Sequence, residues 1–96
     1  MPARLPAQAG LIRFMDWYVY LLKSEKKRWY YVGSTNRLEE RLKEHNSGKV
    51  ESTKTYKPLK LVFQLRFDSE KDARGYERKI KKMRREKEKI IRDIEK

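Results

Sequence analysis

Two short aromatic segments constrain the fold of this chain more than any other feature. Residues 17–22 read WYVYLL and residues 29–33 read WYYVG, and both combine the aromatic and β-branched side chains that are enriched in β-strands. Only the polar residues KSEKKR separate the two segments. Because two strands joined by a short polar link form an antiparallel hairpin, we expect a hairpin here, apolar on both of its faces.

The register of this hairpin determines which side chains meet. We expect Tyr20 and Tyr31 to lie on one face and directly opposite each other. This register pairs positions whose numbers sum to 51, so that Leu22 faces Trp29, and it requires a loop with an even number of residues. Two phenols would then lie together on one surface of the sheet.

A charged helix is expected directly after the hairpin. Gly33 ends the second strand, and Asn36 with Glu39 has the spacing of a capping box that begins a helix. The segment RLEERLKEHN at residues 37–46 would form that helix, and Gly48 is a natural left-handed terminator.

The remainder of the chain predicts a loop, a third strand and one long helix. Residues 49–60 are basic and contain Pro58, which opposes a helix, whereas LVFQLRF at residues 61–67 is typical of a strand. Residues 68–96 would form a single helix capped by Ser69. Its apolar side chains keep a three-four spacing that predicts one buried stripe: Ala73, Tyr76, Ile80, Met83, Ile90, Ile91 and Ile94. The element order β-β-α-β-α predicts an α+β fold, a small three-stranded sheet with helices packed on it.

The charge of the chain bears most directly on its partner. Lys and Arg number 26 against 14 Asp and Glu, for a net charge of +12. Such a field attracts polyanions through counterion release and favours fast, salt-sensitive association. We therefore expect a nucleic acid as the partner, with a basic but merely soluble protein as the alternative.

Several absences narrow the remaining choices. The chain has no cysteine, so it has neither disulfides nor thiolate metal sites, which suits a cytoplasmic location. No apolar run approaches the roughly 20 residues of a membrane span, so we expect no membrane association. We expect one domain over residues 15–96, a loose extension over residues 1–14, and Met15 as an alternative start.

The first helix brings the single histidine of the chain next to an arginine. Arg41 and His45 are four residues apart and hence neighbours on one helix face. That face borders the leucine stripe of the helix, so both side chains lean toward the sheet, where Tyr20 and Tyr31 emerge. Cation, imidazole and phenols would converge there. The alternatives are that both tyrosines are core aromatics and that His45 is a capping or solvated residue.

These residues resemble the GIY-YIG nuclease domain. The motifs YVY at 18–20 and YVG at 31–33 are followed by Arg41 and His45, ten and fourteen residues after the second motif's tyrosine. The segments GSTNRLEERLKEHNSGKV and ARGYERKIKK are similar to stand-alone members related to the nuclease subunit of bacterial excision repair. The resemblance covers about residues 17–85 and implies the same order of elements.

The resemblance implies hydrolysis of DNA phosphodiester bonds with one divalent cation, usually Mg²⁺, with Mn²⁺ as a substitute. Tyr20 and Tyr31 match the two motif tyrosines, one of which would activate water. Arg41 would hold the scissile phosphate, and His45 would assist proton transfer or hydrogen-bond a tyrosine. Glu77 matches the metal-binding glutamate. Specificity would come from nucleic-acid shape or from a protein partner, and a role in DNA repair is implied.

The chemistry of these residues is consistent with that implication. A phenol with a pKa near 10 serves as a base near neutral pH only when nearby positive charge stabilises its phenolate. Mg²⁺ takes oxygen ligands and keeps several waters, so one carboxylate and a substrate phosphate suffice.

Two other functions are consistent with the same sequence. Many relatives place an asparagine beyond the glutamate, and residues 78–96 contain none, which is consistent with a non-catalytic nucleic-acid-binding module with the same fold. Glu77 could equally form an ion pair with Lys81 one turn along the helix. A basic protein-interaction adaptor would explain the charge but leaves Arg41 and His45 without a task.

Basic clusters outside the motif predict where nucleic acid binds. The segment RKIKKMRR at residues 78–85 has six cations and no acid, and a phosphate-binding ridge is preferred over a solvated helix face. The loop before the third strand adds further cations, with Tyr56 among them as a candidate for base stacking. The residues expected to contact nucleic acid are Lys49, Lys54, Lys57, Lys81, Lys82, Arg84 and Arg85.

Overall fold

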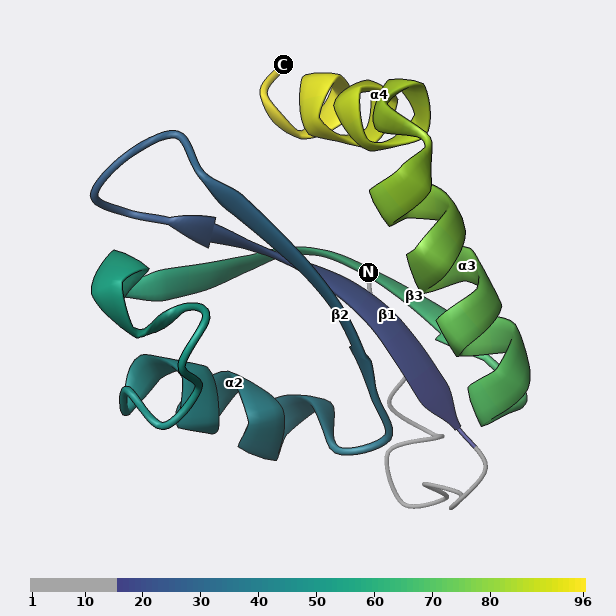
Figure 1. Cartoon of the computed structure of the whole chain (residues 1–96), viewed down its shortest axis with the longest axis horizontal. Helices are drawn as coiled ribbons and strands as arrows, with labels where there is room; N and C mark the ends of the chain where they lie inside the picture. The colour runs from purple at the N-terminus through teal and green to yellow at the C-terminus, as the bar shows by residue number, and fades with distance from the viewer. Residues whose placement is uncertain (1–15) are drawn as a thin grey trace.

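The two aromatic segments form adjacent strands of an antiparallel sheet, as predicted (Figure 1). This computed structural model describes residues 16–96, so the expectations for residues 1–14 and for Met15 lie outside the described residues. The strands are β1 (Trp17–Ser24), β2 (Tyr30–Thr35) and β3 (Leu59–Phe67), in the order β2-β1-β3 across the sheet. β2 therefore forms one edge of the three-stranded sheet.

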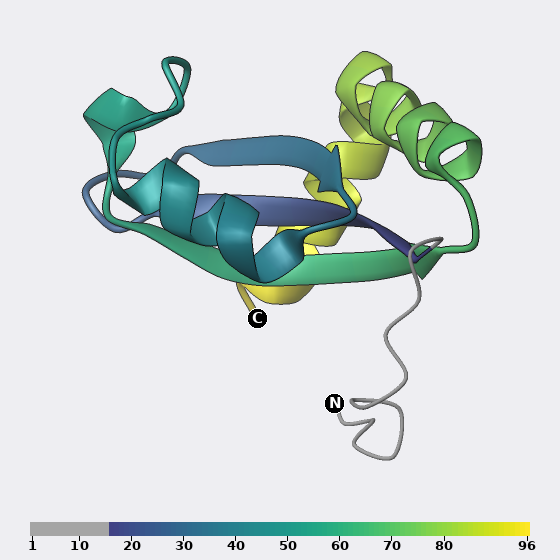
Figure 2. The ribbon, with the colours of Figure 1, turned by 90° about the horizontal axis from the view of Figure 1, so that it is seen from below.

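Helices lie on both faces of this sheet (Figure 2). They are α2 (Leu38–Asn46), the short 3₁₀ helix η1 (Lys54–Tyr56), α3 (Glu70–Lys82) and α4 (Arg84–Ile94). α2 packs on one face, and α3 and α4 pack on the other. The predicted α+β fold is confirmed, with the order β-β-α-β-α-α. Among the described residues, no helix is both long and apolar enough to cross a lipid bilayer.

Each face of the sheet has its own apolar core, because β1 alternates between them. The core beneath α3 and α4 is formed by Val19, Leu21, Tyr30, Val32, Ala73, Ile80 and Ile91. The core beneath α2 is smaller and is formed by Tyr20, Leu22 and Leu59, with Tyr31, Leu38 and Leu42 packed against it. The phenols of the motif therefore belong to the face that α2 covers.

The hairpin register differs from the expected one by two positions. Tyr20 pairs with Gly33, and Leu22 pairs with Tyr31, so the prediction that Tyr20 and Tyr31 lie directly opposite each other was wrong. The amide of Ser24 donates to the carbonyl of Trp29 at 2.9 Å, which closes a shorter loop than expected, still of even length. A shift of two residues preserves the faces, so both tyrosines still lie on the same side.

Two helix boundaries also differ from expectation. The predicted capping box at Asn36 is absent. The N-cap residue of α2 is Arg37, whose side chain makes no capping hydrogen bond, and the amide of Arg37 donates to Thr35 Oγ1 at 3.0 Å. The expected turn residue Gly48 does adopt a left-handed φ of 86°. The predicted cap of α3 is confirmed, because Ser69 Oγ accepts from the amide of Asp72 at 3.1 Å.

The single long helix predicted over residues 68–96 is divided at Met83. Met83 has extended dihedral angles, φ −97° and ψ 90°, and is half exposed, so it does not join the buried stripe. The physical reason lies in residues 81–89, between Ile80 and Ile90. All of them except Met83 are charged, so this stretch has no apolar stripe to pack on the sheet. A straight helix would carry its last isoleucines past the small sheet, whereas the bend returns Ile91 to the core.

Candidate active site

Tyr20 lies across Gly33 at the centre of the hairpin. A Cβ atom at position 33 would lie 2.5 Å from the Tyr20 hydroxyl oxygen and 2.6 Å from Cζ, closer than nonbonded atoms approach. The absence of a side chain at Gly33 therefore creates the space that the phenol fills. The Tyr20 side chain is almost wholly buried, which agrees with a core aromatic, but its hydroxyl has a specific polar partner.

That partner is His45, which is buried beneath α2. The Tyr20 hydroxyl lies 3.0 Å from His45 Nε2, and His45 Nδ1 lies 2.8 Å from Thr53 Oγ1. Thr53 Oγ1 in turn reaches the carbonyl of Val50 at 3.4 Å, and a carbonyl can only accept. The hydrogen bonds therefore take one direction: Tyr20 donates to Nε2, Nδ1–H donates to Thr53, and Thr53 donates to Val50.

The electrostatics of the site keep both groups neutral at pH 7. Burial, assisted by the nearby Arg41 charge, lowers the pKa of His45 from 6.5 to about 4. Burial raises the pKa of Tyr20 from 10 to about 12, although Arg41 opposes this shift. A neutral imidazole can accept a proton at Nε2, so the pair is a phenol donor and a histidine acceptor.

Tyr31 and Arg41 complete the cluster on the α2 face. The Tyr31 ring centroid lies 5.1 Å from that of His45 and 6.4 Å from that of Tyr20. Arg41 Nη1 donates to Glu44 Oε1 at 2.9 Å, yet a third of the Arg41 side chain remains exposed. Arg41 is thus a partly exposed cation beside the buried tyrosine and histidine.

Glu77 approaches the same cluster around the edge of β2. Ser34 Oγ donates to Glu77 Oε1 at 2.5 Å, and Lys81 Nζ lies 2.8 Å from Oε2, so the expected helix ion pair is present. Lys81 also lies 5.9 Å from the centre of the Tyr31 ring. Glu77 adds to the rise in the pKa of Tyr20, whose largest cause is burial, which indicates how close the carboxylate lies.

The oxygen atoms at this edge suit a hard divalent cation. Within residues 16–96, no group of three or more histidine or carboxylate side chains could hold a metal by itself. Glu77 nevertheless offers a carboxylate that Ser34 orients and that remains 16% exposed. Mg²⁺ tolerates one protein carboxylate when waters and phosphate oxygens supply the other ligands, so the donor set fits such an ion.

The cations predicted to bind nucleic acid fall into two groups. On the loop after α2, Lys54 pairs with Glu51 at 3.0 Å, and Lys57 lies beside Gly48. The charge of Lys49 contributes, after Arg41 and Arg37, to a lowered pKa of Glu44. The other group comprises Lys81 and Lys82 at the end of α3, and Arg84 and Arg85 at the start of α4. Only Lys81 has a described contact with the cluster around Tyr31.

Tyr56, the candidate for base stacking, already has an aromatic partner. Its ring stacks on Trp29 with centroids 3.8 Å apart and an interplanar angle of 5°. Trp29 in turn lies 6.3 Å from Tyr31. Lys27 Nζ also lies over the Tyr56 ring, 5.4 Å from its centre, and base stacking on Tyr56 stays a prediction.

Two residues of the site were missed by the sequence analysis. Thr53 lies in an irregular loop eight positions after His45, where no periodicity marks it. Ser34 fell just beyond the predicted end of the second strand at Gly33, although strand periodicity places it on the face toward α3. Recognising that β2 extends to Thr35 would have identified Ser34.

Comparisons with known proteins identify the family that the chain resembles. The sequence model described as the GIY-YIG catalytic domain matches residues 16–90. The chain is 35% identical over 74 residues to the UPF0213 protein YazA of Bacillus subtilis, covering 76% of this chain and 74% of that protein. It is 42% identical over 69 residues to the UPF0213 protein CPE1444 of Clostridium perfringens, covering 71% and 73%. A solution NMR structure of the UPF0213 protein BH0048 from Bacillus halodurans superposes with a TM-score of 0.52 at 34% identity, covering 80% of this chain and 83% of that one.

Proposed function

The chain belongs to the GIY-YIG catalytic domain family, and from this premise we propose that it is a metal-dependent endonuclease that hydrolyses DNA phosphodiester bonds. The observation that carries the proposal is the cluster at the edge of β2. Two tyrosines, a neutral histidine and an arginine lie on the α2 side of that edge, and an oriented carboxylate approaches from α3.

Tyr20 and His45 form the proton-transfer pair of the proposed reaction. In the resting site, the Tyr20 hydroxyl donates a hydrogen bond to His45 Nε2. When water attacks the phosphorus atom, it gives a proton to the Tyr20 oxygen while the phenolic proton moves to His45. Because the pKa of His45 is low, this transfer requires the negative charge that develops on the phosphate oxygens.

Arg41 and Glu77 act on the phosphate from two sides of the edge. The guanidinium of Arg41 presents paired donors that match two phosphate oxygens, and its bond to Glu44 limits its rotation. Glu77 would hold the cation, with Ser34 fixing one carboxylate oxygen. A divalent cation bound there would supply positive charge near the leaving oxygen. Lys81 is the counter-ion of Glu77 in this structure.

The proposed substrate follows from the net charge of the chain. A charge of +12 supplies affinity for any DNA through contacts to phosphates, and such contacts carry no base-sequence information. We therefore propose recognition of DNA structure, with a protein partner as a further source of specificity. Labelled linear, nicked, flapped and four-way DNA, each incubated with and without Mg²⁺, tests this directly. Absence of metal-dependent products from every substrate would refute the endonuclease.

Glu77→Gln separates catalysis from binding. If Glu77 holds the cation, this variant loses cleavage while its metal-free affinity for DNA is equal or higher, because one negative charge is removed. Glu70→Gln is the matched control, since Glu70 also pairs with a cation one turn along α3, Arg74, at 2.6 Å. The control should cut like the parent. Both variants must melt within a few degrees of the parent.

A non-catalytic binding module is the second candidate. The specific observation in its favour is that Ser34 and Lys81 already engage both oxygens of Glu77. A parent that binds DNA but cuts no substrate with Mg²⁺ or Mn²⁺ would establish this alternative.

A further inference from the structure

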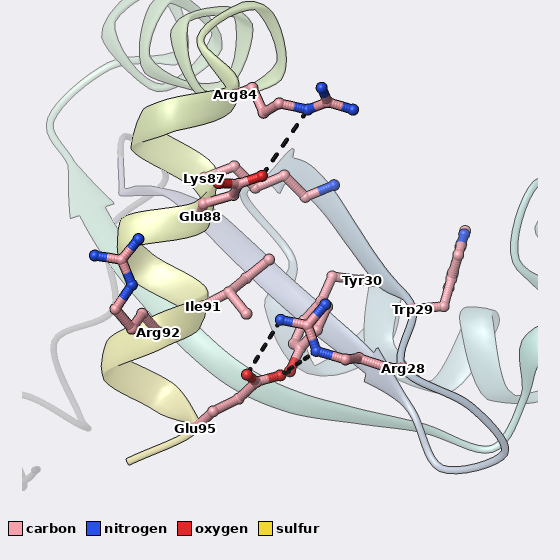
Figure 3. Close-up of a pocket in the computed structure, with 9 residues that line it drawn as sticks. All are labelled: Arg28, Trp29, Tyr30, Arg84, Lys87, Glu88, Ile91, Arg92 and Glu95. Atoms are coloured by element: carbon pink, nitrogen blue, oxygen red, sulfur yellow. Dashed lines mark hydrogen bonds and ion pairs between the residues drawn. The ribbon is translucent and has the colours of Figure 1, made fainter.

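A basic groove separates β2 from α4, outside the cluster described above (Figure 3). It has a volume of about 420 Å³, and its walls carry four cations and two carboxylates. The cations are Arg28, Arg84, Lys87 and Arg92, and the carboxylates are Glu88 and Glu95. Figure 3 shows Arg84 and Lys87 extending from α4 toward β2, whereas Arg92 extends from the other side of the helix.

The carboxylates leave much of this positive charge unneutralised. Glu95 is held by Arg28 through contacts of 2.9 and 3.2 Å and also accepts from the Tyr30 hydroxyl. Glu88 lies 3.9 Å from Arg84, at the limit of an ion pair. Within residues 16–96, Lys87 has no carboxylate partner. Burial and, secondarily, the charge of Lys81 lower the pKa of Lys87. This direction is expected of a partly buried cation that has no anion beside it.

The groove continues the candidate active site along one strand. Ser34, which contacts Glu77, and Tyr30, which lines the groove, are both on β2. Lys81 connects them, because it pairs with Glu77, lies over Tyr31 and is close enough to influence Lys87. Positive charge therefore follows the edge of β2 from the cluster to the groove.

We propose that this groove binds a second phosphate of the DNA strand, with Lys87 as its main contact and Arg84 and Arg28 beside it. Ser34 and Tyr30 are four residues apart, about 13 Å at 3.3 Å per residue of strand. The phosphate bound in the groove is therefore distinct from the phosphate at the cluster. The inference rests on the proposed function, since it extends the same DNA-binding path.

The test measures DNA binding without divalent metal, so it does not depend on cleavage. Affinity of labelled duplex and flapped DNA is measured over a range of salt concentrations for the parent, Lys87→Gln and Lys89→Gln. Lys89 is also on α4 but does not line the groove, so Lys89→Gln is the matched control. We expect Lys87→Gln to weaken binding and to reduce the salt slope by about one, because one phosphate contact is lost. Lys89→Gln should leave the slope unchanged.

A second variant keeps the test decisive if Lys87→Gln does not fold. Arg84 is 90% exposed, so Arg84→Gln should leave the fold intact while also reducing the slope. Equal slopes for the groove variants and the control would overturn the second phosphate site. If the parent cleaves DNA but the groove variants and the control have equal salt slopes, the second phosphate site is refuted and the proposed nuclease activity is not. Binding that depends on Lys87, from a parent that never cuts, would refute the nuclease and leave the groove.

Discussion

The hydroxyl of Tyr20 occupies the space where a side chain at Gly33 would begin, 2.5 Å from the position of its Cβ atom. The two residues are direct partners in the β1–β2 ladder, so backbone pairing places the phenol over the glycine. His45 then holds the hydroxyl from the other side, at 3.0 Å. Gly33 of the second motif is thus needed to position Tyr20 of the first motif.

Gly33→Ala should therefore displace Tyr20 and impair the site. Because the ring is buried and cannot swing into solvent, we expect a loss of about 1–3 kcal/mol in the free energy of unfolding. A shift of about 1 Å in a reacting group costs about 100-fold in rate, so cleavage should fall by at least that factor. Chemical denaturation and cleavage kinetics measure the two effects.

Gly75→Ala is the control for this substitution. Gly75 lies inside α3, and no atom comes within 4 Å of a Cβ placed there. Alanine should stabilise the helix by about 0.5–1 kcal/mol and leave cleavage unchanged. Wild-type cleavage by Gly33→Ala would contradict the dependence of Tyr20 on this glycine.

Thr53 should act on the reaction through His45. Thr53→Val leaves His45 Nδ1–H buried without an acceptor, at a cost of about 1–3 kcal/mol, and frees the ring to change tautomer. Cleavage should fall, and Thr53→Ser should restore it because serine keeps the hydroxyl. Thr55→Val, at an exposed threonine two residues further on, in η1, should change neither quantity. A Thr53→Ser variant as poor as Thr53→Val would indicate a packing role.

The stability of the protein should decrease as the pH falls from 6.5 toward 4. The pKa of His45 is about 4 in the folded state and 6.5 as its ordinary value, so between these values the unfolded chain binds more protons. Stability is therefore fully present above pH 6.5, and up to about 3 kcal/mol is lost by pH 4. His45 is the only histidine, so no other imidazole contributes.

Urea unfolding at several pH values in this window measures the effect. His45→Gln should be less stable than the parent at pH 7, because two buried hydrogen bonds are lost or altered. Its stability should nevertheless change less between pH 6.5 and 4.5. The same slope in both proteins would show that His45 titrates normally in the fold.

The parts of the fold that local pattern dictates could be predicted from the sequence. The alternation of side chains in residues 17–22 predicts that the strand contributes to an apolar core on each face of the sheet. The four-residue spacing of Arg41 and His45 predicts that both lie on the helix face toward Tyr20. The register could not be predicted, because hairpins two residues apart in register bury the same faces and differ only in how the loop closes. Thr53 could not be predicted because its role depends on a tertiary contact across an irregular loop.

The division of the last helix illustrates the same limit. Charged residues around Met83 are all good helix formers, so local preference favours one continuous helix. The small sheet offers too little apolar surface along a straight line, and burial of Ile91 favours the bend. The sequence identified Arg84 as a cation expected to contact nucleic acid, but not that Arg84 and Lys87 line one groove with Arg28, because that depends on how α4 packs beside β2.

Arg41→Lys should distinguish a phosphate clamp from a simple positive charge. Lysine keeps the charge that attracts DNA but loses the paired donors, so metal-free affinity and its salt slope should change little. Cleavage should fall by about 10- to 150-fold, the equivalent of one charged hydrogen bond of about 1.5–3 kcal/mol. Arg37→Lys is the control, because Arg37 also lies near Glu44, at 3.7 Å, but has no described effect on Tyr20. If Arg41→Lys and Arg37→Lys cut equally well, the role of Arg41 is electrostatic attraction alone, and the geometry of its guanidinium contributes nothing to the reaction.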